Sequence, residues 1–205
     1  MKRIFVTGIS TEVGKTIASA IITEALEADY WKPIQAGDLE HSDSQKIAQL
    51  ISNKRTVIHE NSYALKTPMS PHAAADIDGI SIKIDNIIEP RTENHLVIEG
   101  AGGLLVPLND KATILDIIRP NYKVIVVSRH YLGSINHSLL TIACLQKSGF
   151  DVTLLFNGEA HPTTENAILK KTGVRSLGRI QNETSINKAV IKRYADAFRS
   201  SLLSL

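Results

Sequence analysis

The feature that most constrains this chain is a glycine-flanked segment, Gly8-Ile-Ser-Thr-Glu-Val-Gly-Lys-Thr16, which follows the apolar run Ile4-Phe5-Val6. Apolar residues then recur at helical spacing over residues 17–26, so the segment joins a strand to a helix. In such a loop glycines let backbone N–H groups surround phosphate oxygens, a lysine reaches the terminal phosphates and a hydroxyl ligates Mg²⁺. The sequence therefore predicts a phosphate loop, one residue longer than G-x-x-x-x-G-K-[ST] because five residues separate Gly8 from Gly14.

The composition is that of an ordinary globular protein. The chain has 205 residues, of which 43% are hydrophobic and 21% charged, and we predict a single domain over residues 1–205. Lys and Arg number 23 against 21 Asp and Glu, so there is no strong positive field and we expect no nucleic-acid partner. No apolar run approaches the about 20 residues of a membrane span, so no membrane partner is expected.

Cysteine usage and the first residues indicate the compartment. The single cysteine, Cys144, has apolar neighbours and no partner for an internal disulfide, which favours a buried thiol in a reducing compartment. Met1-Lys2-Arg3 leads directly into a strand without the apolar region of a signal peptide. We therefore expect a cytoplasmic protein.

Strand-like and helix-like segments alternate along the chain. Short apolar runs without strict polar alternation predict buried parallel strands at 96–98, 124–127 and 152–156, and a shorter strand at 30–33. Helical spacing is found at 43–50, 114–118, 135–146, 167–171 and 186–198, whereas residues 52–95 are irregular. This order predicts an α/β fold with a doubly wound, mainly parallel sheet flanked by helices, of the P-loop NTPase-like class.

Ligands of such sheets gather beyond the carboxyl ends of the strands, and chemically suggestive residues follow several predicted strands here. Glu99 comes directly after residues 96–98 and precedes a glycine-rich turn, where a second acidic group for Mg²⁺ is expected. Lys32 ends another strand and would add positive charge near a nucleotide. Each of these residues also has a purely structural interpretation. The residues after Glu99 could form a plain glycine turn, and Lys32 could face solvent. Asp43 is a weaker candidate, because Ser42-Asp43 could simply cap the helix that follows.

Taken together, these motifs resemble the dethiobiotin synthetase family of the biotin pathway. Gly8–Thr16 resembles the family's elongated phosphate loop, Lys32-Pro-Ile-Gln-Ala-Gly37 its lysine segment and Glu99-Gly-Ala-Gly-Gly103 its acidic glycine turn. Ser70-Pro71-His72, Leu132-Gly-Ser-Ile-Asn-His137 and Asn157 follow in the family's order. The resemblance covers residues 1 to about 180.

The resemblance implies a set of site residues. It assigns the nucleotide to Glu12, Val13, Gly14, Lys15, Thr16, Ile17, Asp43, Glu99, Gly100, Ala101, Gly102, Asn157 and Gly158, with Asn157 at the adenine. Mg²⁺ would be held by Thr16, Asp43 and Glu99. The organic substrate would lie along Thr11, Lys32, Ala36 and Gly102, and Lys15 and Lys32 would be the catalytic cations.

The reaction implied by the resemblance consumes ATP, CO₂ or bicarbonate and 7,8-diaminononanoate. One amine takes up CO₂ as a carbamate, the carbamate attacks the γ-phosphoryl group, and the second amine closes the ureido ring to give dethiobiotin, ADP and phosphate. Positioning and electrostatics dominate such phosphoryl transfer. The resemblance also implies a homodimer with the diamine near the subunit boundary.

Three stretches depart from the family's pattern. Ala36 replaces a residue that often carries a hydroxyl, so a side-chain hydrogen bond to substrate is lost or replaced there. The residues 179–183 read Arg-Ile-Gln-Asn-Glu where the family places a proline and apolar residues beside the adenine. Residues 53–67 match poorly, and His59 and Asn61 receive no role.

Three other functions are compatible with a phosphate loop. A nucleotide-driven switch of the partitioning-ATPase type usually carries a second lysine early in the loop, which is absent between Gly8 and Gly14. An amidoligase that activates a carboxylate normally needs an ammonia-supplying domain, for which 205 residues leave no room. A simple kinase leaves the combination of Lys32 with Glu99-Gly-Ala-Gly-Gly103 unexplained.

Overall fold

The computed structural model describes residues 1–205 and consists of nine strands and six α-helices. The strands are β1 (Arg3–Gly8), β2 (Asp29–Trp31), β3 (Ile34–Ala36), β4 (Ile58–His59), β5 (Tyr63–Leu65), β6 (Leu96–Gly103), β7 (Lys123–Arg129), β8 (Val152–Asn157) and β9 (Arg175–Ile180). The helices are α1 (Lys15–Leu26), α2 (Asp43–Leu50), α3 (Pro71–Asp78), α4 (Ser134–Lys147), α5 (Pro162–Thr172) and α6 (Lys188–Leu203). Short 3₁₀ turns occupy Leu39–His41, Ile84–Asn86 and Ile114–Ile117.

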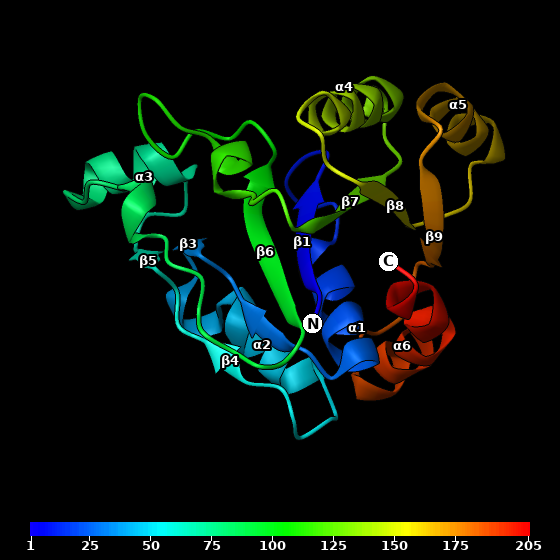
Figure 1. Cartoon of the computed structure of the whole chain (residues 1–205), viewed down its shortest axis with the longest axis horizontal. Helices are drawn as coiled ribbons and strands as arrows, with labels where there is room; N and C mark the ends of the chain where they lie inside the picture. Colours follow the sequence, from blue (N-terminus) through cyan, green and yellow to red (C-terminus); the bar gives the residue numbers. More distant parts are fainter.

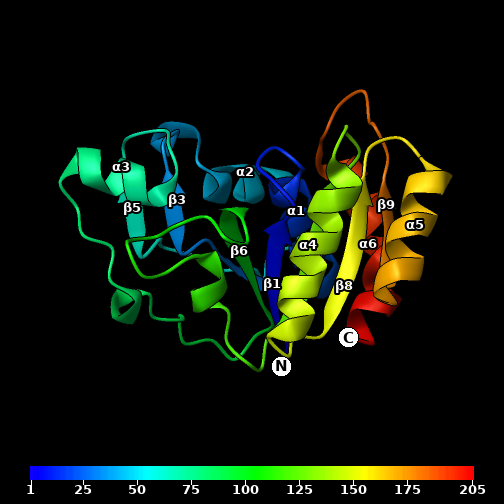
Figure 2. The same cartoon turned by 90° about the horizontal axis from the view of Figure 1, so that it is seen from above.

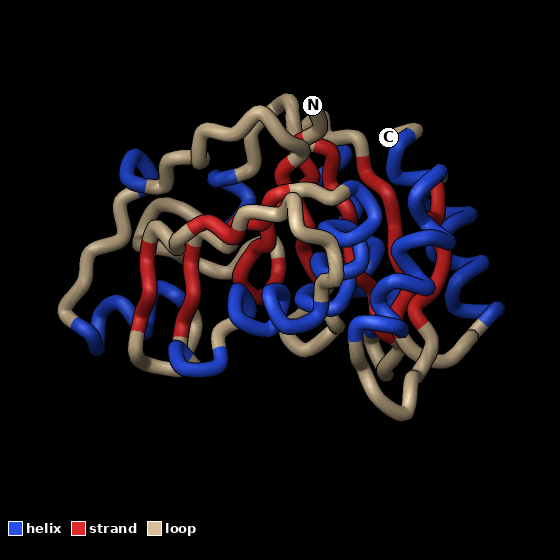
Figure 3. The backbone as a smooth tube through the Cα atoms, turned by 90° about the horizontal axis from the view of Figure 1, so that it is seen from below, coloured by secondary structure: helices blue, strands red, loops and turns tan.

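Seven strands form one parallel sheet in the order β4-β2-β6-β1-β7-β8-β9. Helices α4 and α5 cover one face, and α1, α2 and α6 cover the other (Figure 1). This confirms the predicted doubly wound parallel sheet. The strands β3 and β5 form a separate two-stranded parallel sheet beside α3, which Figure 3 shows apart from the main sheet.

The central strands are apolar because both of their faces are covered. Ile4, Phe5 and Val6 of β1 are fully buried, and so are Ile125 and Val126 of β7. Burial on both faces removes the polar alternation of half-exposed strands, as expected of a parallel sheet between two helical layers. None of the helices is long and apolar enough to span a membrane.

Helix α1 packs against the sheet between α2 and α6, and most of its side chains are buried, including Ile21 and Ile22. A helix that is apolar on nearly all sides is stable only where its neighbours enclose it. Its enclosure holds the preceding phosphate loop firmly at the carboxyl edge of the sheet. Both chain termini lie at the opposite edge (Figure 2).

The structure corrects three predicted boundaries. The strand β6 continues to Gly103, so Glu99 lies within a strand and pairs with Val6 instead of following the strand. The strand β2 ends at Trp31, and Lys32 lies just beyond it. The helix expected at 114–118 is a single 3₁₀ turn, because the N–H groups of Ile114 and Leu115 donate to the carbonyls of Val106 and Leu104 after β6.

Several elements were not predicted. The strand β9 was missed because its residues are mainly polar or glycine, since it forms an edge of the sheet with only Leu177 and Ile180 buried. Within the irregular residues 52–95 the structure has the short strands β4 and β5 and the helix α3. The predicted helices at 167–171 and 186–198 are longer or displaced, as α5 and α6.

Candidate active site at the carboxyl edge of the sheet

The phosphate loop closes directly over the start of α1. Gly14 is the N-cap of α1 with φ 95°, and Ala18 N–H donates to Gly14 O at 3.0 Å. A side chain at Gly14 would collide with the amide of Asn157, because the two segments pack against each other here. A left-handed φ and this close approach both require glycine, as the sequence motif predicts.

Lys15 curls back over its own loop. Its Nζ donates to the carbonyl of Ser10 at 3.1 Å, and only 8% of the residue is exposed. Burial lowers the pKa of Lys15, and the attraction of Glu99 offsets this only in part. The ammonium group therefore lies where it can reach an anion held by the loop, as it does in a phosphate loop.

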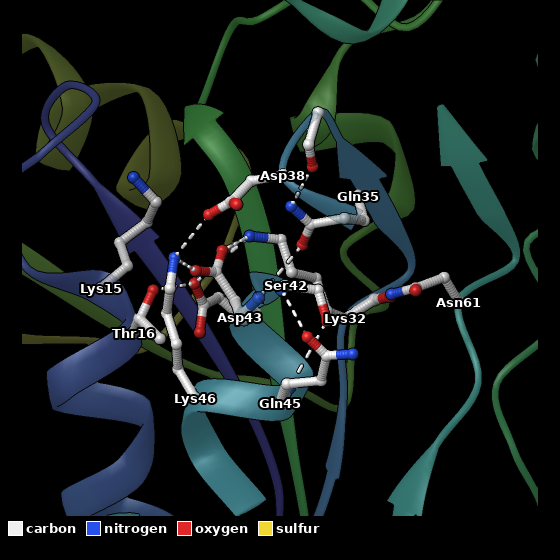
Figure 4. Close-up of polar contacts among 12 residues, drawn as sticks. Lys15, Thr16, Lys32, Gln35, Asp38, Ser42, Asp43, Gln45, Lys46 and Asn61 are labelled. Carbon is white, nitrogen blue, oxygen red and sulfur yellow. Dashed lines mark hydrogen bonds and ion pairs between the residues drawn. The ribbon is translucent and has the colours of Figure 1, made fainter. Parts of the chain in front are cut away.

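Four charged or hydroxyl side chains from four segments converge next to this loop, and Figure 4 labels three of them, Thr16, Lys32 and Asp43. The Lys32 ammonium contacts Asp43 and lies 3.5 Å from Glu99 Oε1, and Thr16 Oγ1 donates to the same Glu99 oxygen at 3.0 Å. Lys32 and Glu99 are 6% and 1% exposed, so both charges depend on this contact for compensation. The sequence placed these residues at one edge, and the structure brings them together.

The charges of the cluster shift its pKa values in opposite directions. Burial works against the charged form of Lys32, but the facing carboxylates of Glu99 and Asp43 outweigh it and raise the pKa of Lys32. Burial likewise opposes ionisation of Asp43, yet Lys32 holds the pKa of that carboxyl below its usual value. Lys32 and Asp43 are therefore both charged at neutral pH.

Glu99 has a further partner that the sequence did not reveal. Tyr30 on β2 is fully buried and donates its hydroxyl to Glu99 Oε2 at 2.9 Å. Burial, together with the charge of Glu99, raises the pKa of Tyr30 well above its usual value. Tyr30 thus remains a proton donor that orients the carboxylate, and nothing in the local sequence distinguishes it from a core tyrosine.

The position of Asp43 follows from the start of α2. Ser42 is the N-cap, because its Oγ accepts from Gln45 N–H at 3.4 Å and its own N–H donates to the Gln45 side chain at 3.0 Å. This capping box leaves the Asp43 carboxylate free to face Lys32. Ser42 therefore caps the helix, and Asp43 begins it.

Asn61 supports the backbone of Lys32. Its Nδ2 donates to the Lys32 carbonyl at 2.6 Å, and the next residues lead into β5 of the small sheet. His59 on the edge strand β4 pairs with Asp29 on the neighbouring strand β2 at 3.3 Å. Sequence reasoning had no role for either residue, because both contacts join segments about 30 residues apart.

Three cavities lie along this edge. The first, of about 590 Å³, holds the charged cluster and is lined by Glu12, Gly14, Lys15, Thr16, Ile17, Lys32, Asp43, Lys46, Gln49, Leu50, Glu99, Gly102 and Ile186. The second, of about 430 Å³, is lined mainly by Thr11, by residues 103–107 and by residues of α4, including His137 and Cys144. The third, of about 240 Å³, is lined by residues 129–130, 157–161 and 182.

The cavities separate the residues predicted from the sequence. The first contains the predicted lysines and metal ligands, the second contains Thr11, and the third contains Asn157 and Gly158. The remaining predicted residues, Val13, Gly100, Ala101 and Ala36, line none of the three. Cys144 is half-buried, which corrects the expected buried thiol.

The oxygen atoms of the cluster suit a hard divalent cation. Thr16, Asp43 and Glu99 supply one hydroxyl and two carboxylates around the position of a single ammonium group. Mg²⁺ is usually held by one or two carboxylates together with substrate phosphates and water. No group of three or more His, Cys, Asp or Glu side chains is placed to hold a metal, which leaves phosphate oxygens to complete such a site.

Comparison with known proteins decides the family. A family model described as an AAA domain matches residues 2–190. The chain is 58% identical over 205 residues to the ATP-dependent dethiobiotin synthetase BioD of Christiangramia forsetii, covering 100% of this chain and 99% of that protein. The BioD protein of Cytophaga hutchinsonii is 48% identical over 95% of this chain and 96% of its own length. This chain belongs to the ATP-dependent dethiobiotin synthetase family.

Membership makes the chain an ATP-dependent enzyme of the ligase class that forms C–N bonds, and confirms the resemblance seen in the sequence. Solved structures of the same fold include a plasmid partition protein of Borrelia burgdorferi bound to AMPPNP, with a TM-score of 0.61 and 14% identity over 99% of this chain and 98% of that one. The MinD–MinC complex of Aquifex aeolicus has a TM-score of 0.58 at 14% identity, covering 100% and 95% of the two chains. At this identity the likeness concerns the fold alone.

Arg179 lies in β9, where the sequence departs from the expected family pattern, and the structure shows its contacts. Its guanidinium pairs with Glu165 on α5 and donates to the carbonyls of Gly158 and Glu159 at 3.3 and 3.0 Å. It also lies 5.6 Å from the ring centre of Phe156. Arg179 therefore holds the loop after β8 in place, instead of facing solvent.

Asn157 ties this loop to the phosphate loop of the synthetase, because its Nδ2 donates to Val13 O at 2.8 Å. We expect Asn157→Ala to raise the KM for ATP about tenfold, equivalent to about 1.4 kcal/mol, with kcat changed less than about twofold, since the phosphate loop loses a positioning contact. Steady-state kinetics with ATP varied would measure it. Asn166→Ala, on the exposed surface of α5, is the matched control. An unchanged KM in Asn157→Ala would show that this contact does not position the loop.

Proposed function

We propose that the chain catalyses the closure of the ureido ring of dethiobiotin from 7,8-diaminononanoate, CO₂ and MgATP. The observation that carries this is the convergence of Lys15, Lys32, Thr16, Asp43 and Glu99 on one cavity beside the phosphate loop. Two ammonium groups next to two carboxylates and a hydroxyl suit a reaction in which negative charge moves between a carbamate and a phosphoryl group. The names of the full-length relatives support the same substrate.

In the proposed reaction one substrate amine attacks the carbon of CO₂, forms a C–N bond and loses a proton. A carbamate oxygen then attacks the γ-phosphorus, and the bond to the departing ADP oxygen breaks. The second amine attacks the carbamoyl carbon of the resulting carbamic-phosphoric anhydride, loses a proton and expels phosphate. Atoms and charges balance without an oxidant or reductant.

Each residue of the cluster has a role in this proposal. The backbone of Glu12–Ile17 surrounds the triphosphate, with Gly100, Ala101 and Gly102 on the facing strand. Thr16, Asp43 and Glu99 hold Mg²⁺, which neutralises phosphate charge when it is bound. Lys15 and Lys32 neutralise the carbamate and the transferring phosphoryl group, and Tyr30 keeps the Glu99 carboxylate oriented, as its 2.9 Å hydrogen bond supports.

The organic substrate is proposed to lie between Thr11, Lys32, Ala36 and Gly102. Thr11 lines the 430 Å³ cavity and Gly102 lines the 590 Å³ cavity, and the two residues are neighbours, because a side chain at Gly102 would be in van der Waals contact with the Thr11 methyl group. Asn157 and Gly158 are proposed to meet the adenine. Ala36 offers backbone contact only, because it has no side-chain hydroxyl.

We further propose a cytoplasmic homodimer of single-domain subunits. The 430 Å³ cavity is lined by two exposed leucines, Leu105 and Leu140, and Leu132, just before α4, is fully exposed. An apolar rim beside a binding cavity is typical of a protein–protein contact. A second copy of the chain would cover these leucines and close the diamine site.

The test is a reaction mixture of protein, MgATP, ¹⁸O-labelled bicarbonate and 7,8-diaminononanoate, with each component omitted in turn and one arm treated with EDTA. We expect dethiobiotin and phosphate in equal amounts only when all components are present, and none with EDTA. Because the carbamate oxygen is transferred to phosphorus, the phosphate should carry one ¹⁸O. Product mass and phosphate isotope are read by mass spectrometry.

Two outcomes would contradict the proposal. ATP hydrolysis indifferent to the diamine, without dethiobiotin, would exclude the synthetase activity and favour a nucleotide switch. Dethiobiotin with unlabelled phosphate would retain the activity but exclude attack by the carbamate oxygen on the γ-phosphorus.

A further inference from the structure

Helix α2 presents a third lysine to the cavity of the phosphate loop. Asp43, Lys46 and Gln49 follow one another at intervals of three residues, so they lie along one side of the helix, and all three line the 590 Å³ cavity. The Lys46 ammonium lies 3.7 Å from Asp43 Oδ1, and Figure 4 shows it pointing toward the same group of side chains as Thr16 and Asp43. Neither the motifs nor the reaction assigns a role to this lysine.

The other two lysines of the cavity are already engaged by buried groups. Lys32 contacts Asp43 and Glu99, and Lys15 donates to Ser10 O. Lys46, in contrast, has a surface partner, with its Nζ 3.0 Å from Asp38 Oδ2. The Lys46 and Asp38 side chains are 46% and 54% exposed. An exposed ion pair contributes little net stability, so Lys46 can exchange Asp38 for another anion at small cost.

The charges of the cavity favour such an exchange. Its lining carries the carboxylates of Glu12, Asp43 and Glu99 against three ammonium groups, so without Lys46 the wall around a polyphosphate would be net negative. MgATP is itself an anion, so a further cation on the cavity wall offsets the excess of negative charge that its binding would create. Lys46 lies 3.7 Å from Asp43 and lines the same cavity as Lys15 and Thr16 of the phosphate loop, so its ammonium group can reach a polyphosphate held there.

We propose that Lys46 is a further nucleotide-binding residue, which exchanges its contact with Asp38 for an oxygen of the β- or γ-phosphate when the nucleotide binds. This inference rests on the proposed function only in taking a nucleoside triphosphate as the ligand of the cavity. Lys46 contributes to the binding of the nucleotide and not to the chemical step. An arginine at this position would still offer a positive charge to the phosphate, whereas a methionine of similar length would not.

The test measures the Kd of Mg-AMPPNP, a non-hydrolysable ATP analogue, by isothermal titration calorimetry without diamine or bicarbonate. We expect Lys46→Met to raise the Kd of AMPPNP about tenfold. In Lys46→Arg the Kd of AMPPNP should stay within about threefold of the parent value. The Kd of AMP should be unchanged in both variants. Asp38→Asn removes the competing partner of Lys46 and should lower the Kd of AMPPNP. Combined with Lys46→Met, it should leave the Kd of that single variant unchanged.

The matched control is Lys170→Met, which removes an exposed lysine near the end of α5, and thermal melts check that all variants fold. An unchanged AMPPNP Kd in a folded Lys46→Met variant, or an equal loss in Lys170→Met, would overturn the proposal. So would an effect confined to the KM of the diamine, which would assign Lys46 to the organic substrate. Because AMPPNP binding requires no turnover, failure to form dethiobiotin would contradict the proposed function and leave this test intact.

Discussion

Replacement of Lys15 by methionine is expected to lower kcat for dethiobiotin formation about 10³-fold, which corresponds to about 4 kcal/mol of lost transition-state stabilisation. Lys15 is 8% exposed and its ammonium lies against the phosphate loop, so no water-exposed cation can replace it. Methionine fills a similar volume and leaves no unpaired buried charge. Single-turnover measurements with saturating MgATP would separate the chemical step from binding.

Lys15→Arg distinguishes charge from shape. The planar guanidinium of arginine is bulkier than an ammonium and does not fit the narrow loop in the same place. We therefore expect Lys15→Arg to lower kcat at least about 10²-fold as well. Lys170→Met should retain full activity. A Lys15→Met variant within about tenfold of the parent would contradict the assignment of Lys15 as the catalytic phosphate-loop lysine.

Lys32→Met is expected to damage both stability and turnover. The variant leaves Glu99, which is 1% exposed, and Asp43 facing each other without their shared cation. Removal of one partner of a buried ion pair costs about 3–5 kcal/mol, and we expect the lower end here because the Asp43 side chain is 18% exposed. The free energy of unfolding would be measured by urea denaturation without nucleotide, and turnover should fall about 10²-fold or more.

The double variant Lys32→Met/Asp43→Asn supplies the control, because it removes one of the two facing charges. We expect it to regain part of the lost stability but none of the lost turnover. If Lys32→Met unfolds at the same urea concentration as the parent, the ion pairs of the cluster contribute nothing to folding. If it turns over normally, Lys32 is not a catalytic cation.

The pH dependence of this stability difference follows from the pKa shifts. The pKa of Asp43 is lowered, so its contribution is present above the unfolded value of 3.8 and is lost as the pH falls through the folded value. The pKa of Lys32 is raised, so its contribution is present below the unfolded value of 10.5 and is lost as the pH rises through the folded value. The difference between parent and Lys32→Met should therefore be constant across the neutral range.

The sequence by itself determined the elements whose signals are local. The glycines and the lysine of residues 8–16 specify a strand–loop–helix turn, because Gly14 adopts a left-handed φ that the motif anticipates. The apolar runs of β7 and β8 specify buried parallel strands, since only a two-sided environment removes polar alternation. The predicted helix at 43–50 agrees with α2, whose start is fixed locally by the capping box of Ser42 and Gln45.

The tertiary structure alone decided how residues far apart in the chain share charge. Tyr30 and Glu99 are 69 residues apart, and Asn157 and Val13 are 144 apart, so no local pattern could reveal their hydrogen bonds. Lys46 was not singled out, because a lysine in the second turn of a helix looks like any solvated residue until Asp38 and Asp43 are placed beside it. Local conformation depends on the propensities of neighbouring residues, whereas the pairing of buried charges depends on which strands the folded sheet sets side by side.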